Sequence, residues 1–196
     1  IGARPAARVQ ASAQNSHPLH AVWRIPVRPL FAIRHWGVLM RPTRYPAAWP
    51  TNAAFKIFDA MELEVAYLGR DLLKCCGHDQ KWQGMTEVFE KLKAYNQTKV
   101  QATGIDTLVT SCAECFRTFA RDYELDEIKV MHTTEFLLES GIDLEMMAPE
   151  GTTVTYHDPC RLGRQMGIYD EPRELIGKVE NVELVEMEHT GEDALC

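Results

Sequence analysis

The spacing of its cysteines constrains this chain more than any other feature of its sequence. Six of the 196 residues are cysteine, arranged as Cys-Cys-Gly at residues 75–77, Cys-x-x-Cys at residues 112–115, and single cysteines at positions 160 and 196. No secretory signal is recognisable in the sequence, which favours metal ligands or redox groups over a disulfide framework.

The first four cysteines form a pattern that suits one shared centre. Cys112 and Cys115 place two sulfurs where both can bind the same metal, and a position between a strand and a helix favours the thiolate form that binds metal. Cys75 and Cys76 can both reach one large or irregular centre, and Gly77 lets the chain turn tightly beside it. A Cys-Cys-Gly combined with a Cys-x-x-Cys is far more specific than either alone.

Predicted strands and helices alternate along residues 51–196. Short apolar runs predict strands, and apolar side chains at three- and four-residue spacing predict helices. The predicted strands are 64–68, 107–110, 128–131, 152–156 and 182–187, and the predicted helices are 53–61, 82–103, a helix from the Cys-x-x-Cys to about residue 123, 133–139 with Thr133 as its cap, and 171–179. This alternation predicts an α/β fold, a mainly parallel sheet with flanking helices. Most of the cysteines follow predicted strands, where parallel sheets build their sites.

A short internal repeat indicates two related modules. A helix, a strand and a loop to a cysteine occur twice, with Val65 ten residues before Cys75 and Val185 eleven residues before Cys196. Such a match favours a pseudo-repeat. We therefore expect a first cysteine-rich module at residues 51–150 and the start of a second, truncated one at residues 151–196.

The beginning of the chain differs from the rest. Residues 1–58 contain seven Arg and one Lys but no Asp or Glu, and residues 1–50 hold seven of the ten Pro without helical or strand periodicity. An organelle leader, a disordered basic arm and a translation in a non-native frame all fit, and the last is favoured. We assign residues 1–50 no fold and no function, and we expect the chain to be incomplete at both ends, because it starts at Ile1 and stops at Cys196.

Charge and hydropathy exclude several classes of protein. Residues 59–196 hold 13 basic and all 28 acidic residues, a balance of −15, which argues against nucleic-acid binding. No run approaches the roughly 20 apolar residues that span a bilayer, so we expect a soluble, cytoplasmic chain. No Gly-rich dinucleotide fingerprint occurs, so a flavin or nicotinamide would sit on another chain.

These motifs resemble the cysteine-rich "CCG" domain found in the B and D subunits of heterodisulfide reductases. Related domains occur in the iron–sulfur subunits of glycolate, lactate and anaerobic glycerol-3-phosphate oxidation systems. The likeness extends over residues 51–196, and beyond the Cys-Cys-Gly it is carried by residues 110–115, 132–137, 156–164, 169–173 and 183–187.

The resemblance implies an iron–sulfur electron-transfer oxidoreductase subunit. In heterodisulfide reductases such modules hold noncubane [4Fe–4S] clusters that reduce the disulfide between two thiol coenzymes. It implies electron supply from a ferredoxin-like or flavin-containing partner, and delivery to a disulfide or, through a membrane protein of the same complex, to quinones. Any association with a membrane would then run through a partner. The residues it assigns are Cys75, Cys76, Cys112 and Cys115 for a first cluster and Cys160 and Cys196 for a second.

Two departures from the family pattern fall near the ends of the chain. The first module should have a leading cysteine near residues 36–40, which contain none. The second module should continue after Cys196 with another Cys-Gly and a later Cys-x-x-Cys. The chain therefore holds four of five ligands of the first module and two of five of the second.

Other interpretations of the same residues stay open. Four thiolates also suit a structural Zn²⁺ site in a binding module without a redox role. A redox dithiol at Cys112 and Cys115 would leave the Cys-Cys-Gly unexplained. Around Cys160, Asp158 is expected to fix a turn or cap a helix. Arg161 and Arg164 would contact an anionic substrate, offset cluster charge, or form surface salt bridges.

Overall fold

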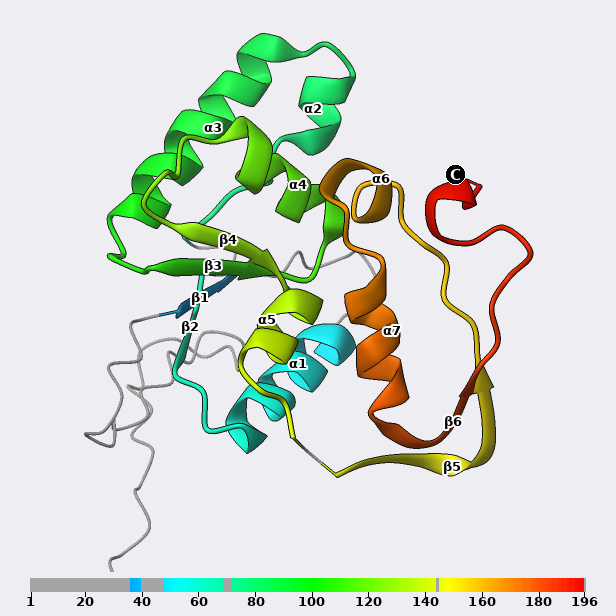
Figure 1. Ribbon diagram of the computed structural model, residues 1–196. Helices are drawn as coiled ribbons and strands as arrows, with labels where there is room; N and C mark the ends of the chain where they lie inside the picture. Colours follow the sequence, from blue (N-terminus) through cyan, green and yellow to red (C-terminus); the bar gives the residue numbers. More distant parts are fainter. Residues whose placement is uncertain (1–35, 40–47, 69–71, 144, 196) are drawn as a thin grey trace, which may run out of the picture.

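The computed structural model describes residues 36–39, 48–68, 72–143 and 145–195. It contains two α/β units, one with a four-stranded and one with a two-stranded parallel sheet, and each includes a βαβ arrangement (Figure 1). The elements of the first unit are β1 (Trp36–Leu39), α1 (Ala48–Ala60), β2 (Val65–Tyr67), α2 (His78–Trp82), α3 (Thr86–Gln101), β3 (Thr107–Thr110), α4 (Ala113–Asp122), β4 (Lys129–His132) and α5 (Thr133–Glu139). Those of the second are β5 (Met146–Val154), α6 (Gly163–Met166), α7 (Asp170–Gly177), β6 (Val179–Leu184) and the 3₁₀ turn η1 (Gly191–Asp193).

The first unit is a parallel sheet covered on both faces. Its strand order is β2-β1-β3-β4, and every neighbouring pair is parallel. Helices α2, α3 and α4 lie over one face, and α1 and α5 lie over the other (Figure 1). The predicted α/β fold with a mainly parallel sheet is therefore confirmed.

The two faces of β3 each build a separate core. All four of its residues are buried, as expected for a central strand covered on both sides. Because side chains alternate along a strand, Leu108 packs into the cluster under α3 and α4, while Val109 packs into the cluster under α1 and α5. In this second cluster, Phe58 of α1 meets Phe136 of α5 edge to face, with their ring centroids 5.6 Å apart.

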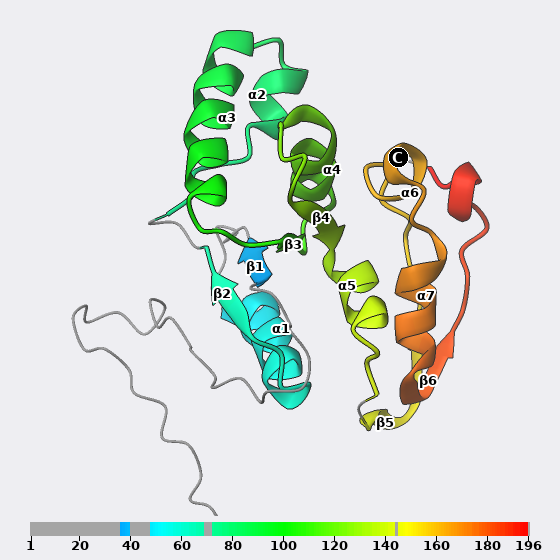
Figure 2. The ribbon, with the colours of Figure 1, turned by 60° about the vertical axis from the view of Figure 1, so that its left-hand side comes forward.

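The second unit repeats the beginning of the first. Strands β5 and β6 pair in parallel with α7 between them, as β1 and β2 do with α1 between them. Helix α7 lies beside α5 in both views (Figures 1 and 2), and its Leu175 packs against the cluster of Phe58 and Phe136. The repeated βαβ arrangement agrees with the predicted pseudo-repeat.

The structure places regular elements across both expected module borders. Strand β1 lies within residues 1–50, to which we assigned no fold, and it is a central strand, bonded to both β2 and β3. The border between residues 150 and 151 falls inside β5. The rest of residues 1–50, apart from the start of α1, lies outside the described residues, so the division into modules stays a prediction.

Two local predictions need correction. The helix expected at 82–103 is α3, which begins only at Thr86, because Gly84 adopts a left-handed φ of 75° after α2 ends at Trp82. Helix α5 is capped by His132 and not by Thr133: the imidazole accepts a hydrogen bond from the Thr134 backbone, and Glu135 accepts one from the His132 N–H. Within the described residues, no helix is long and apolar enough to cross a membrane.

Replacement of Phe58 by alanine tests the core between α1 and α5. The side chain is fully buried, so Phe58→Ala should lower the free energy of unfolding by about 3–5 kcal/mol through lost burial and a cavity. Urea unfolding followed by circular dichroism measures the change. Val88→Ala, at a side chain 40% exposed on α3, serves as the control and should shift stability by about 0.5 kcal/mol or less. Equal midpoints for the two variants would contradict this packing.

Candidate metal centre

The Cys-Cys-Gly and the Cys-x-x-Cys lie on two loops that follow parallel strands of the first sheet. Cys75 and Cys76 come between β2 and α2, and Cys112 and Cys115 come where β3 ends and α4 begins. Cys112 is the extended N-cap residue of α4, and Cys115 lies in its first turn. Parallel strands end at one edge of a sheet, which is why loops far apart in sequence bring these cysteines together.

The four sulfurs follow one another as an open line of thiols. The Cys115 Sγ donates a hydrogen bond to the Cys76 Sγ at 3.2 Å. Hydrogen bonds also join Cys115 to Cys112 and Cys76 to Cys75, so the order along the line is Cys75, Cys76, Cys115, Cys112. Cys76 and Cys115 are buried, Cys112 is half-buried and Cys75 is exposed. No three of these four sulfurs lie within 4.8 Å of one another.

The hydrogen bonds within this line divide the thiols into proton acceptors and a proton donor. Hydrogen bonds from Cys115 and Cys75 lower the pKa of Cys76 to about 3, against the opposing effect of burial. A hydrogen bond from Cys115 lowers the pKa of Cys112 to about 7. The same bonds to Cys112 and Cys76 raise the pKa of Cys115, which keeps its proton. Because Cys115 has one thiol proton to share between Cys76 and Cys112, Cys76 is the thiolate available to a metal near neutral pH.

A buried asparagine and a tyrosine hold the Cys-Cys-Gly loop. The Asn96 side chain is fully buried on α3; it accepts a hydrogen bond from the Lys74 N–H at 2.8 Å and donates to the Cys75 carbonyl at 3.0 Å. It also donates to the Tyr123 hydroxyl at 3.1 Å, and that hydroxyl donates to the Cys76 carbonyl at 3.0 Å. The backbone of both adjacent cysteines is thus fixed by two side chains from separate elements.

Gly77 is required directly after the two cysteines. It has a φ of 82°, in the left-handed region that other residues rarely adopt, and an added Cβ would come within 2.8 Å of the Phe89 ring. Phe89 is itself 3% exposed in the core beneath α3, so it has little room to move. The glycine therefore allows Cys76 to sit close to the core.

The Cys160 loop is held by a separate buried ion pair. Asp158 forms a two-pronged contact with Arg173, at 2.7 and 2.8 Å, and accepts a hydrogen bond from the Gly191 N–H at 2.7 Å. These contacts join Asp158 to residues 173 and 191 and not to the turn at Pro159, so its role in that turn stays a prediction. Arg164 donates to the carbonyls of Glu192 and Ala194, so it secures the segment before the C-terminus.

The Cys160 loop also packs against the helix of the Cys-x-x-Cys. Leu162 and Ile168 form one buried cluster with Phe116 of α4. The Arg161 guanidinium stacks 3.9 Å from the centre of the Trp82 ring, and Trp82 ends α2. The structure thus brings Cys75, Cys76, Cys112 and Cys115 together and puts half-buried Cys160 on an adjoining loop. The sixth predicted ligand, Cys196, lies outside the described residues.

Sequence reasoning missed the residues that support the cysteines. Asn96 stands on the same stripe of α3 as Phe89 and Val100, both of which are buried. A polar side chain at such a position must find buried partners, and this is the signal that could have found it. Nothing in the sequence identifies Tyr123 as its partner, because the contact joins residues 27 positions apart.

Comparison with known proteins agrees with this arrangement. The model of the CCG cysteine-rich domain matches residues 39–120 and 154–196, more than half of the chain. The chain belongs to the CCG cysteine-rich domain family. The two matched stretches begin at the last residues of β1 and β5, the corresponding strands of the two βαβ units. The resemblance identified from the sequence is confirmed.

The curated relatives are larger redox proteins. The chain is 32% identical over 155 residues to the D subunit of the dihydromethanophenazine:CoB–CoM heterodisulfide reductase of Methanosarcina acetivorans, covering 74% of this chain and 37% of that protein. It is 37% identical over 120 residues to the B subunit of the fumarate reductase (CoM/CoB) of Methanothermobacter marburgensis, covering 60% and 24%. It is 26% identical over 149 residues to an EtfAB:quinone oxidoreductase of Syntrophomonas wolfei, covering 74% and 21%. The chain thus spans well under half the length of each, and no solved structure matches it.

Removal of the Tyr123 hydroxyl tests the support of the Cys-Cys-Gly loop. Tyr123→Phe takes away the donor to the Cys76 carbonyl and leaves Asn96 one partner short, so we expect a loss of about 1–3 kcal/mol of stability. We also expect faster reaction of the metal-free thiols with a thiol reagent such as dithionitrobenzoate. Tyr95→Phe, at a half-exposed position of α3, is the matched control. Identical stability and thiol reaction rates in both variants would disprove the support role.

The ion pair of Asp158 gives the protein an acid-sensitive contact. The Arg173 guanidinium lowers the pKa of Asp158 from 3.8 to about 2. A lowered folded-state pKa stabilises the fold above pH 4 and loses that effect as the pH falls toward 2, by about 2 kcal/mol in total. Wild-type protein should therefore lose more stability between pH 5 and pH 2 than Asp158→Asn does. Urea unfolding at several pH values measures this, with exposed Asp126→Asn as a control that should follow the wild type.

Proposed function

We propose that Cys75, Cys76, Cys112 and Cys115 hold an iron–sulfur cluster, and that the chain is part of an electron-transfer oxidoreductase of the heterodisulfide reductase type. The observation that carries the proposal is the line of four sulfurs from two loops at one sheet edge, in which hydrogen bonds lower the pKa of Cys76. Such a cluster, when bound, would accept and release single electrons.

The geometry of the thiols supports a cluster over a single zinc ion. Four thiolates around one Zn²⁺, with bonds of about 2.3 Å, lie about 3.8 Å from one another. The four sulfurs here form an open line in which no three lie within 4.8 Å of one another. An extended set of donors suits a polynuclear centre, in which each iron needs its own ligand. Structural zinc remains the second candidate because the donors are four thiols.

Burial divides the proposed centre into an inner and an outer side. Cys76 and Cys115 are each 3% exposed, whereas Cys75 is exposed. The inner thiols exclude water from their side of the centre, and the Asn96–Tyr123 hydrogen bonds keep their loop in place. Substrate or partner would approach from the side of Cys75.

The names of the relatives support a role in disulfide or quinone chemistry. One relative is named as part of a CoB–CoM heterodisulfide reductase, another as part of a CoM/CoB fumarate reductase, and a third as a quinone oxidoreductase. We propose a disulfide as electron acceptor: reduction takes two electrons and two protons and yields two thiols. We also propose that the cluster is of the noncubane [4Fe–4S] type and that its electrons come from a ferredoxin-like or flavin-containing partner. Cys160 and Cys196 would belong to a second cluster. Cytoplasmic location, with a membrane reached only through a quinone-linked partner, belongs to the same proposal.

The metal content of the chain tests this proposal directly. After anaerobic purification and reconstitution, we expect about four iron and an equal amount of acid-labile sulfide per chain, with a broad visible absorption that bleaches on reduction. Cys76→Ser should lose most of the iron because it removes the central thiolate. Cys160→Ser, the matched control outside the line of thiols, should keep the first cluster.

Other outcomes would redirect the proposal in definite ways. About one zinc per chain without sulfide would replace the cluster with a structural site. Equal loss of iron in Cys76→Ser and Cys160→Ser would mean that the four thiols do not act as a separate set. If the clusters form but the chain, combined with a reduced donor, cannot cleave small disulfides, the cluster stands and the disulfide acceptor does not.

A further inference from the structure

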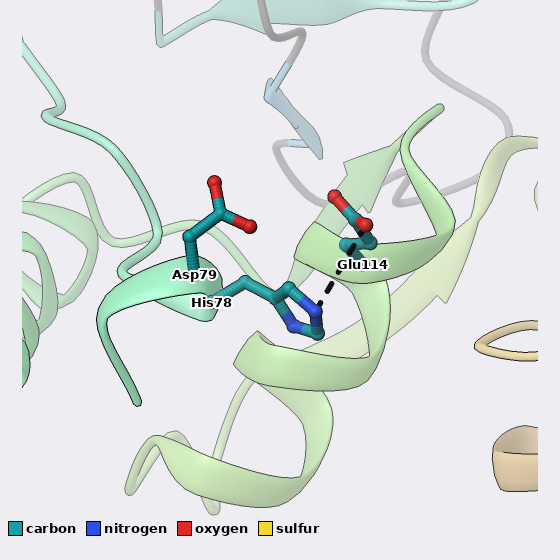
Figure 3. Close-up of side chains that lie close together, drawn as sticks. All are labelled: His78, Asp79 and Glu114. Carbon is teal, nitrogen blue, oxygen red and sulfur yellow. Dashed lines mark ion pairs between the residues drawn. The ribbon is translucent and has the colours of Figure 1, made fainter. Parts of the chain in front are cut away.

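The geometry points to a second metal site that uses no cysteine: a divalent cation held by His78, Asp79 and Glu114 (Figure 3). Their ligand atoms, one imidazole nitrogen and two carboxylate oxygens, all lie within 4.8 Å of one another. Within the described part of the chain, no other group of three histidine, cysteine or acidic side chains has its ligand atoms within 4.8 Å of one another. The inference does not depend on the iron–sulfur proposal, since none of its ligands is a thiol.

His78 is oriented for this role by a buried hydrogen bond. His78 is 4% exposed. Its Nδ1 lies 3.2 Å from the hydroxyl of Thr118, which is fully buried in α4. This contact fixes the ring and turns Nε2 toward Glu114, as Figure 3 shows. Histidines that bind metals are commonly held in the same way, with the other ring nitrogen hydrogen-bonded by the protein.

The separation of the ligand atoms suits a bound ion better than a direct contact. His78 Nε2 lies 3.9 Å from Glu114 Oε1, which is longer than a hydrogen bond. Two ligands that each bind a first-row metal at about 2.1 Å lie about 3–4.2 Å apart, depending on the angle at the metal. The histidine and the glutamate already stand at that separation. The Asp79 carboxylate, within 4.8 Å, needs to move by only about an ångström to meet the same limit.

The charge around the three side chains favours a cation. Two cationic side chains of the same helices, Lys81 and Arg117, both pair with Asp122, whose side chain is 4% exposed, with Lys81 Nζ at 2.6 Å. Asp122 therefore offsets one of these two positive charges, and Asp79 and Glu114 bring two further carboxylates to the same place. A site with one nitrogen and two carboxylate oxygens suits Mn²⁺, Fe²⁺ or Zn²⁺.

The position of this site links the two cysteine loops. His78 and Asp79 begin α2 directly after the Cys-Cys-Gly, and Glu114 stands between the two cysteines of the Cys-x-x-Cys. A cation there would tie α2 to α4, and so would hold the loop of Cys76 against the helix of Cys115. Its effect would be to stabilise the joint on which the line of thiols depends.

Mn²⁺ is the probe for the experiment, because it prefers oxygen and nitrogen ligands and binds thiolates poorly. Titration of the full, anaerobically reconstituted chain, with free Mn²⁺ followed by electron paramagnetic resonance, should reveal one saturable site per chain. Asp79→Asn and Glu114→Gln should each weaken binding at least tenfold. Glu90→Gln, an exposed carboxylate of α3, should leave it unchanged, and so should Cys75→Ser, which alters the thiols alone.

Several results would overturn the inference. One is the absence of saturable Mn²⁺ binding, and another is equal Mn²⁺ affinity in Asp79→Asn and Glu90→Gln. A third is loss of Mn²⁺ binding in Cys75→Ser, which would assign the ion to the thiols. Asp79 is half-exposed at the start of a short helix, so its variant should fold even if Glu114→Gln does not. Circular dichroism of each variant confirms that a loss of binding is not a loss of fold.

Discussion

The hydrogen bonds of Asn96 are the contact on which the site depends. A fully buried amide is destabilising unless its donors and acceptors are used, and here they bond to the backbone of Lys74 and Cys75 and to the Tyr123 hydroxyl. Tyr123 in turn holds the Cys76 carbonyl. The loop of the adjacent cysteines has no regular structure of its own, so its shape is set by α3 on one side and by the end of α4 on the other. This network adds to the hydrophobic packing that holds Cys76 beside Cys115.

The same network explains why thiolates can exist in a half-buried place. Burial alone disfavours a charged sulfur, yet the pKa of Cys76 is low, because Cys115 and Cys75 donate hydrogen bonds to it. Hydrogen bonds of this kind form only if the two loops are held at a fixed separation. The contacts of Asn96 and Tyr123 lie on the backbone of Cys75 and Cys76, and Cys75 is exposed. A centre built this way is fixed from the core side and open from the solvent side.

Much of the fold and the grouping of the four central cysteines could be predicted from the sequence, and the misses have physical causes. The strand at 107–110 and the helix at 133–139 were predicted with the bounds that they have, because buried runs and helical spacing are local signals. The four central cysteines were recognisable because their pattern is rare. Strand β1 was missed: its four residues form a strand only through pairing with β2 and β3, which come later in the chain. Asn96 and Tyr123 were missed for the same reason, since each gains its role from a contact distant in sequence.

The two βαβ units give the cysteines of this chain unequal surroundings. Cys160 follows β5, whereas neither β1 nor residues 40–47 after it contain a cysteine, so the leading cysteine expected in the first unit is missing. The first unit therefore contributes the cysteines of the Cys-Cys-Gly and the Cys-x-x-Cys without a leading one, whereas the second contributes Cys160 within the described residues. Because the Cys160 loop packs through Leu162 on Phe116 of α4, the leading cysteine of one unit is held against the Cys-x-x-Cys helix of the other. Packing between the units, and not the local sequence of either, thus decides how close the two sets of thiols can come.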